Sequence, residues 1–191
     1  MLNSEVYIFD PTPRAIEHVQ YIKNLLNGKE TYKPNLRFGG GDPNYLDLII
    51  KYKINTDKIK FYNYGLYIED NIVKFYEPSN KEYVSHSAVH GMKSDNYINA
   101  EMKTLKTIMK ELGHDKIDLL KIDIEGCECD VIEQMIDNNI YPKYLSVDFD
   151  LGWTGEKLRD RNRCINVINL LQKNGYKISH YHNADYSFIL I

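Results

Sequence analysis

The segment IDLLKIDIEGCE, Ile117–Glu128, is the stretch of this 191-residue chain that best indicates its fold. Apolar side chains dominate it as far as Ile124, carboxylates gather at its end, and Gly126 interrupts the run. The pattern predicts a buried strand over residues 117–123 that turns through glycine into a helix. Ligands of open α/β sheets bind beyond the carboxyl ends of the strands, so we expect the chemistry of this protein here.

The rest of the chain alternates predicted strands with predicted helices. Thr12 is placed to cap the first helix, Thr104 to cap the third, and Gly113 to end the third. Strands are expected at 6–10, 60–68, 117–123 and 144–150, with short β pieces at 73–76 and 83–84; helices at 14–26, 45–53, 104–112, 127–138 and 156–173; and a terminal strand pair at 176–181 and 186–191. This order predicts an α/β fold with a mostly parallel, doubly wound sheet and an antiparallel C-terminal strand pair, in a single domain over residues 1–191.

Composition excludes several classes of function. The net charge is −3, and lysine and arginine are scattered among acidic residues, which argues against a nucleic-acid partner. The first residues lack the basic and apolar regions of a signal peptide, and no run is long enough to span a membrane. Cys127, Cys129 and Cys164 are odd in number and two of them lie at an apparent helix start, which argues against a disulfide framework. We therefore expect a cytoplasmic protein that does not associate with membranes.

Two carboxylates follow the central predicted strand. Asp123 and Glu125 are two positions apart and would face the same way if the strand continued, and Glu128 falls in the first turn of the next helix. A carboxylate whose pKa is raised beside another can act as a general base. The alternative is that these groups only hydrogen-bond the turn and cap the helix.

A second acidic group, Asp148 and Asp150, ends the neighbouring predicted strand. Together with Asp123, these side chains could supply oxygen ligands to Mg²⁺, with water completing the coordination. The simpler reading is a solvated strand end.

The polar segment 85–96, SHSAVHGMKSDN, is the strongest candidate for a loop over the site. It contains His86 and His90, while His180 and His182 alternate along a late predicted strand. Any of the four can act as a base near neutral pH, but none has a fixed partner in the sequence. The sequence favours surface or structural roles for them.

Four stretches together resemble the FkbM-type methyltransferases, a branch of the Rossmann-like enzymes that use S-adenosylmethionine. They are VYIFDPTPRAIEHV (6–19), LKTIMKELGHDKIDLLKIDIEGCECDVIEQM (105–135), YLSVDFD (144–150) and the NGY…DYSFILI ending. The resemblance implies methyl transfer from S-adenosylmethionine, with O-methylation of a sugar or another small hydroxyl-bearing acceptor as the expected reaction.

The resemblance also implies which residues meet the cofactor. Asp10 would accept the ribose hydroxyls, with Thr12 beside it. Asn63 and Gly65 would meet the adenine side, and Asp123 would lie against the cofactor as well. The alternative for Asp10 is that it only caps the turn that follows it.

The chain departs from the family pattern at its start. Members of the family carry a first strand and a glycine-rich turn before the position of Val6, and only five residues precede Val6 here. The glycine cluster Gly39–Gly41 comes too late in the chain, and we interpret it as a surface loop. The expectation is a family member without its N-terminal cofactor-binding unit.

A missing central strand would leave two rows of unpaired backbone groups. Three arrangements would resolve this: the Asp10 strand pairs with the Lys121 strand, a second copy forms a homodimer, or a partner chain supplies the missing strand. The alternative function is a catalytically silent remnant that acts as a binding module or as one half of a split enzyme.

Overall fold

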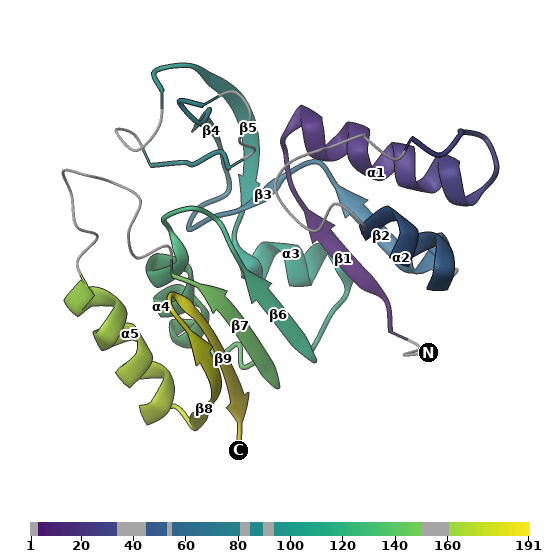
Figure 1. Ribbon diagram of the computed structural model, residues 1–191. Coiled ribbons are helices and arrows are strands. Elements are labelled where there is room, and N and C mark those ends of the chain that lie inside the picture. The colour runs from purple at the N-terminus through teal and green to yellow at the C-terminus, as the bar shows by residue number, and fades with distance from the viewer. Residues whose placement is uncertain (1–3, 34–44, 53–54, 81–84, 90–93, 150–160) are drawn as a thin grey trace.

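The computed structural model describes residues 4–33, 45–52, 55–80, 85–89, 94–149 and 161–191 (Figure 1). The helices are α1 (Pro13–Leu26), α2 (Tyr45–Tyr52), α3 (Leu105–Leu112), α4 (Glu128–Asp137) and α5 (Arg161–Lys173), with a 3₁₀ turn at Thr56–Lys58. The strands are β1 (Val6–Phe9), β2 (Ile59–Tyr62), β3 (Gly65–Leu66), β4 (Asn71–Tyr76), β5 (Tyr97–Lys103), β6 (Leu119–Ile122), β7 (Tyr144–Asp148), β8 (Tyr176–His182) and β9 (Asp185–Leu190). The surface loop predicted at Gly39–Gly41 and the β piece predicted at 83–84 lie outside the described residues.

The helix ends follow the local signals in the sequence. The hydroxyl of Thr12 accepts a hydrogen bond from the N–H of Ala15 at 3.3 Å, which caps α1. Thr104 caps α3 in the same way, and Gly113 ends that helix in the left-handed conformation with φ of 68°. The predictions for these boundaries are confirmed.

The described strands form three separate sheets, which corrects the prediction of one mostly parallel sheet. β1 and β2 make a parallel pair; the second sheet has the order β3–β5–β4; the third has the order β6–β7–β9–β8. β6 and β7 are parallel, and β9 is antiparallel to both β7 and β8. The antiparallel C-terminal pair is confirmed. Among the described strands, β1 pairs with β2 and β6 pairs with β7, and β1 and β6 belong to different sheets, so a single doubly wound sheet is not confirmed.

The predicted strand at 60–68 is two strands in different sheets. β2 ends at Tyr62, and β3 begins at Gly65 and pairs with β5. β5 itself was not predicted, although its sequence YINAEMK carries the period-two signal of a strand. Ala100 and Met102 are buried, while Glu101 between them is exposed.

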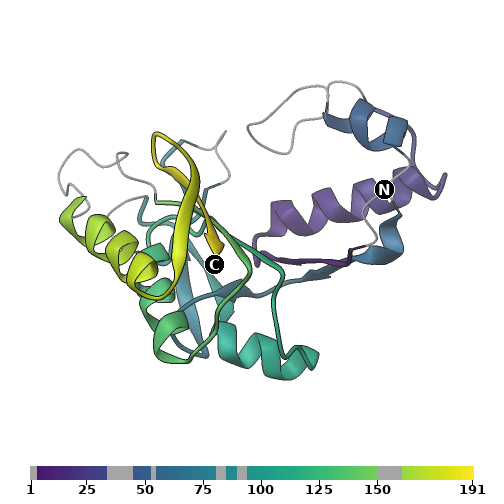
Figure 2. The ribbon, with the colours of Figure 1, turned by 90° about the horizontal axis from the view of Figure 1, so that it is seen from below.

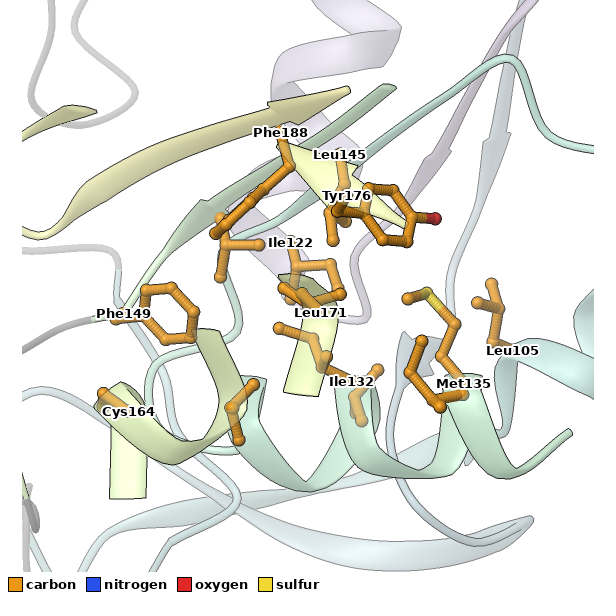
Figure 3. Close-up of a cluster of buried hydrophobic side chains, with 14 residues drawn as sticks. Leu105, Ile122, Ile132, Met135, Leu145, Phe149, Cys164, Leu171, Tyr176 and Phe188 are labelled. Carbon is orange, nitrogen blue, oxygen red and sulfur yellow. The ribbon is translucent and has the colours of Figure 1, made fainter. Parts of the chain in front are cut away.

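The main hydrophobic core lies between the third sheet and the helices α4 and α5 (Figure 3). Ile132 and Met135 of α4 and Leu171 of α5 are at most 1% exposed, and they pack with Leu145 and Phe188 of the sheet. Within the described residues, these helices cover one face of this sheet, so the predicted burial of the central strand is observed on that face only. On β6, Ile122 is 0% exposed, whereas Leu119 on the other face is 64% exposed.

Helices lie on both sides of β1. Figure 2 shows α1 on one side of this strand and α3 on the other. The ring of Tyr7 on β1 meets the ring of His114 just after α3 edge-on, with 4.6 Å between the centroids. Within the described ranges, no helix is both long and apolar enough to cross a membrane.

Candidate functional site

The turn between β6 and α4, residues 123–128, has an unusual backbone. β6 ends at Ile122, so Asp123 and Glu125 do not continue an extended strand as the sequence suggested. Glu125 has φ of 57° and Gly126 has φ of 132°. A non-glycine residue in the left-handed region costs of order 1 kcal/mol or more and persists only when its surroundings hold it. Strain of this kind is common at functional sites.

The carboxylate of Glu128 accepts hydrogen bonds from the backbone of this turn. Glu128 is 3% exposed. It occupies the first position of α4, within the first helical turn where the sequence placed it. The carboxylate accepts the backbone N–H of Gly126 at 2.9 and 3.1 Å and that of Ile124 at 3.2 Å. These bonds satisfy two backbone N–H groups of the turn just before the N-terminus of α4. The observed contacts of Glu128 are therefore those of an anchor for the turn.

Ser87, from a distant segment of the chain, also forms a hydrogen bond with this turn. Its hydroxyl donates to the carbonyl oxygen of Glu125 at 2.6 Å and accepts the N–H of Val89 at 3.0 Å. Ser87 is 0% exposed and forms an isolated β-bridge with Tyr76. The described part of the 85–96 segment thus contacts the β6–α4 turn. Sequence reasoning expected the segment near the site but did not single out Ser87, because a contact between residues 38 positions apart leaves no local signal.

Asp10 lies directly after β1. One carboxylate oxygen, Oδ1, accepts the backbone N–H of Thr12 at 2.8 Å, and the backbone N–H of Asp10 donates to Tyr62 on β2 at 3.1 Å. The capping role considered for Asp10 is therefore observed. Its second oxygen, Oδ2, makes no hydrogen bond within the described part of the chain. Ribose binding by Asp10 stays a prediction, as does a cofactor contact by the 7% exposed Thr12.

Gly65 packs closely against Met102. A Cβ added there would collide with the sulfur of Met102 on β5 and come within 3.5 Å of Pro11. Its neighbour Tyr64 is 7% exposed, and the ammonium of Lys103 lies 4.4 Å from the centre of the Tyr64 ring. Asn63 is exposed at the junction between β2 and β3. Contacts of Asn63 and Gly65 with a cofactor remain predictions.

Asp123 and Asp148 follow the last residue pair of the β6–β7 register, Ile122 with Val147. Asp123 forms an ion pair with Lys121 at 3.2 Å, and both side chains are about half exposed. Asp148 ends β7 and is paired in register with Asp185 of β9. The described His, Cys, Asp and Glu side chains form no group of three that could hold a metal ion. Asp150, the third proposed ligand, lies outside the described residues.

Three of the four histidines of interest, His86, His180 and His182, lie within the described residues, with His86 on a different part of the chain from the other two. The ring of His86 packs near Phe75, with 5.4 Å between the centroids. His180 and His182 are exposed on β8, and His90 lies outside the described residues.

A hollow of about 420 Å³ lies beside β2 and the end of α1. Its lining comprises Lys23, Asn27, Thr56, Asp57, Ile59, Lys60, Phe61 and Tyr62, and none of the predicted site residues. The candidate site is therefore the set of groups at the carboxyl ends of β1 and β6: Asp10, Asp123 and the β6–α4 turn, with Ser87 against the turn.

The family model described as Methyltransferase FkbM domain matches residues 4–178, which is most of the chain. No curated protein and no solved structure matches the chain. The match supports a methyltransferase function, and methyltransferases generally take the methyl group from S-adenosylmethionine. The chain belongs to the FkbM methyltransferase domain family.

Proposed function

We propose that this chain is an S-adenosylmethionine-dependent methyltransferase that O-methylates a sugar or another small hydroxyl-bearing acceptor. The observation that carries the proposal is the position of Asp10 and of the strained β6–α4 turn at the carboxyl ends of β1 and β6, in a chain that belongs to this family. Carboxyl ends of strands are where open α/β folds bind ligands.

The residues after β1 fit the ribose of the cofactor. Asp10 Oδ1 is occupied by the N–H of Thr12, which fixes the orientation of the carboxylate. Oδ2 is left to accept hydroxyl hydrogen bonds from a ligand. Asn63, Gly65 and Asp123 complete the proposed cofactor contacts.

The bound cofactor would supply the methyl group as a sulfonium. The chain's own residues then have to position the acceptor hydroxyl and take its proton, and positioning alone can contribute much of the rate. Asp123 is half exposed and Glu125 is part-buried, so either can reach an acceptor more easily than the buried Glu128. We assign acceptor positioning and proton removal to Asp123 and Glu125, with Glu128 acting through the shape of the turn.

Calorimetric titration of the chain with S-adenosylmethionine and S-adenosylhomocysteine tests the proposal. We expect micromolar binding that Asp10→Ala abolishes and Asp10→Asn retains in part, because asparagine keeps the Oδ1 contact with Thr12. Asp118→Ala is the matched control, since this exposed aspartate precedes β6 at the opposite end of the strand. Equal affinities for all four proteins would reject the Asp10 site.

A screen of hydroxyl-bearing acceptors then follows the formation of S-adenosylhomocysteine. Loss of turnover in Asp123→Asn or Glu125→Gln, with cofactor affinity retained, would support their roles toward the acceptor. A requirement for Mg²⁺ through Asp123, Asp148 and Asp150 is a separate question that the same assay answers. Full turnover in excess EDTA would exclude it.

The second candidate is a catalytically silent binding module or one half of a split enzyme, and the unpaired edges of β1 and β6 favour it. The backbone N–H of Asp10 donates to Tyr62 on β2, and the backbone carbonyl of Asp118 accepts from Tyr144 on β7. These two bonds show which side of each strand is paired. By alternation, the backbone groups of Tyr7 on β1 and of Leu119 and Lys121 on β6 point to the other side. In the described residues, no strand pairs with these edges.

Exposed apolar side chains on one face of the third sheet also favour this second candidate. Leu119 and Tyr144 are 64% and 46% exposed there, and parallel strands are normally covered on both faces. A further strand supplied by a second copy or by a partner chain would pair both edges and complete the cofactor site.

Light scattering combined with hydrogen exchange separates the two candidates. Fast exchange of the Tyr7, Leu119 and Lys121 amides in a monomer that binds no cofactor up to millimolar concentration would support the split-enzyme candidate. A dimer with these amides protected would identify a second copy as the partner. A monomer with micromolar cofactor affinity would reject this candidate.

A further inference from the structure

Two cysteines from different helices meet at the edge of the core. The sulfur of Cys129 on α4 lies 3.7 Å from the sulfur of Cys164 on α5, and the two thiols are in hydrogen-bond contact. Cys164 is 5% exposed, whereas Cys129 is only part-buried. Neither is in a disulfide. A disulfide needs a sulfur separation of about 2 Å, so a small side-chain movement separates this contact from a covalent bond.

An ion-pair cluster beside the thiols holds the two helices together. Arg163, the neighbour of Cys164, donates to both Asp130 and Glu133 of α4, the second at 2.9 Å. Asp130 is the neighbour of Cys129. The charged pairs therefore connect the same two helices one residue away from the sulfur contact, and they favour a fixed distance between the thiols.

We propose that Cys129 and Cys164 are a redox modification site at which peroxide forms an intramolecular disulfide between α4 and α5. The Cys129 thiolate attacks one oxygen of hydrogen peroxide, which breaks the O–O bond and gives a sulfenic acid and, after protonation, water. The Cys164 sulfur then attacks the sulfenic sulfur and expels a second water. Two thiols are oxidised, one peroxide is reduced, and no further reactant is needed.

The location gives the modification a structural consequence. Cys129 follows Glu128, whose carboxylate holds the backbone of the β6–α4 turn. A disulfide from Cys129 to Cys164 on α5 would fix the first turn of α4, and with it the β6–α4 turn of the candidate site. The contact with Cys164 and burial raise the pKa of the Cys129 thiol, so little thiolate is present at neutral pH and the oxidation should be faster at higher pH.

Treatment of the reduced chain with hydrogen peroxide, followed by alkylation under denaturing conditions and mass spectrometry, tests the proposal. We expect the loss of two hydrogens, one alkylated cysteine, and a cross-linked peptide pair that contains Cys129 and Cys164. The oxidised protein should melt roughly 5–10 °C higher, reversibly with dithiothreitol. Cys127→Ser is the matched control: this buried thiol lies two positions from Cys129, and its loss should leave the cross-link intact.

Cys129→Ser and Cys164→Ser should each prevent the cross-link. Circular dichroism of both variants verifies that they fold, and the peptide mapping of the wild-type chain does not depend on them. A Cys127–Cys129 bond, a disulfide-linked dimer, or overoxidation of Cys129 without a cross-link would each overturn the proposal.

Discussion

The hydroxyl oxygen of Ser87 lies 2.6 Å from the carbonyl oxygen of Glu125, so a segment between β4 and β5 holds the turn that follows β6. Glu128 holds the same turn through the N–H groups on either side of Glu125. The strained conformation of Glu125 is therefore restrained by a donor from Ser87, 38 positions away in the chain, and by an acceptor from the nearby Glu128.

Ser87→Ala should destabilise this arrangement. The change leaves the Glu125 carbonyl without its donor at a 0% exposed position, so the free energy of unfolding should fall by about 1–3 kcal/mol in urea titrations. Cofactor affinity should fall with it. Ser94→Ala is the control, because Ser94 makes a similar bond to the carbonyl of Glu77 away from the turn. Equal loss of cofactor affinity in both variants would count against a special role for Ser87.

Glu128→Gln should act mainly on stability. Glutamine has a single acceptor oxygen and no charge, so it cannot keep all three contacts with Ile124 and Gly126. We expect a loss of about 1–3 kcal/mol in the free energy of unfolding. Glu133→Gln, at an exposed position of the same helix, should cost less than half as much. If turnover fell while stability was unchanged, Glu128 would be a direct participant in the reaction.

Gly65→Ala separates packing from cofactor binding. The added methyl group meets the sulfur of Met102, and overpacking of this kind costs about 1–3 kcal/mol. The loss of stability in the double variant Gly65→Ala/Met102→Ala should be smaller than the sum of the losses in the two single variants. Strict additivity in chemical denaturation would refute the packing explanation. Recovery of cofactor binding in the double variant would show that Gly65 acts only through Met102.

Asp70→Asn should change the response to acid. Hydrogen bonds from the Thr107 hydroxyl at 2.6 Å and the Thr104 N–H at 2.7 Å lower the pKa of Asp70 below its ordinary value of 3.8. Because the pKa of Asp70 is lower in the folded protein than in the unfolded chain, the ionised carboxylate stabilises the fold at pH values above the unfolded pKa. This contribution disappears as the pH falls through the folded pKa. Asp70 is exposed to solvent, so the difference from wild type should be about 1 kcal/mol or less at pH 7. Unfolding measured from pH 7 to pH 2 should show the two proteins converging, and a constant difference would contradict the linkage.

Tyr176→Phe should change the response to alkali. Burial raises the pKa of Tyr176 to about 12, and its hydroxyl donates to the carbonyl of Pro142 at 2.8 Å. The unfolded chain ionises this group near pH 10, so the wild type should lose stability as the pH rises from 10 to 12. The phenylalanine variant should be about 1 kcal/mol less stable at neutral pH and should lose less over that range. Parallel pH profiles for the two proteins would rule out this assignment.

Much of the local structure was predictable from short stretches of sequence. The caps at Thr12 and Thr104 and the stop at Gly113 depend on side-chain and backbone preferences of a few neighbouring residues, and each was predicted at the right position. The carboxylates after the β6 sequence were likewise apparent from the order of apolar and acidic residues. The family resemblance, carried by four stretches, was confirmed by the match over residues 4–178.

Tertiary structure decided how these pieces combine. The division into three sheets depends on which strand edges pair, and pairing is set by contacts between distant residues that a local pattern does not encode. The contacts Ser87–Glu125, Gly65–Met102 and Cys129–Cys164 join residues 35 to 38 positions apart. The sequence alone therefore determined the caps at Thr12 and Thr104, the stop at Gly113, the carboxylates after β6 and the family. The shape of the turn at the candidate site also depends on the packing of Ser87, a residue far away in the chain.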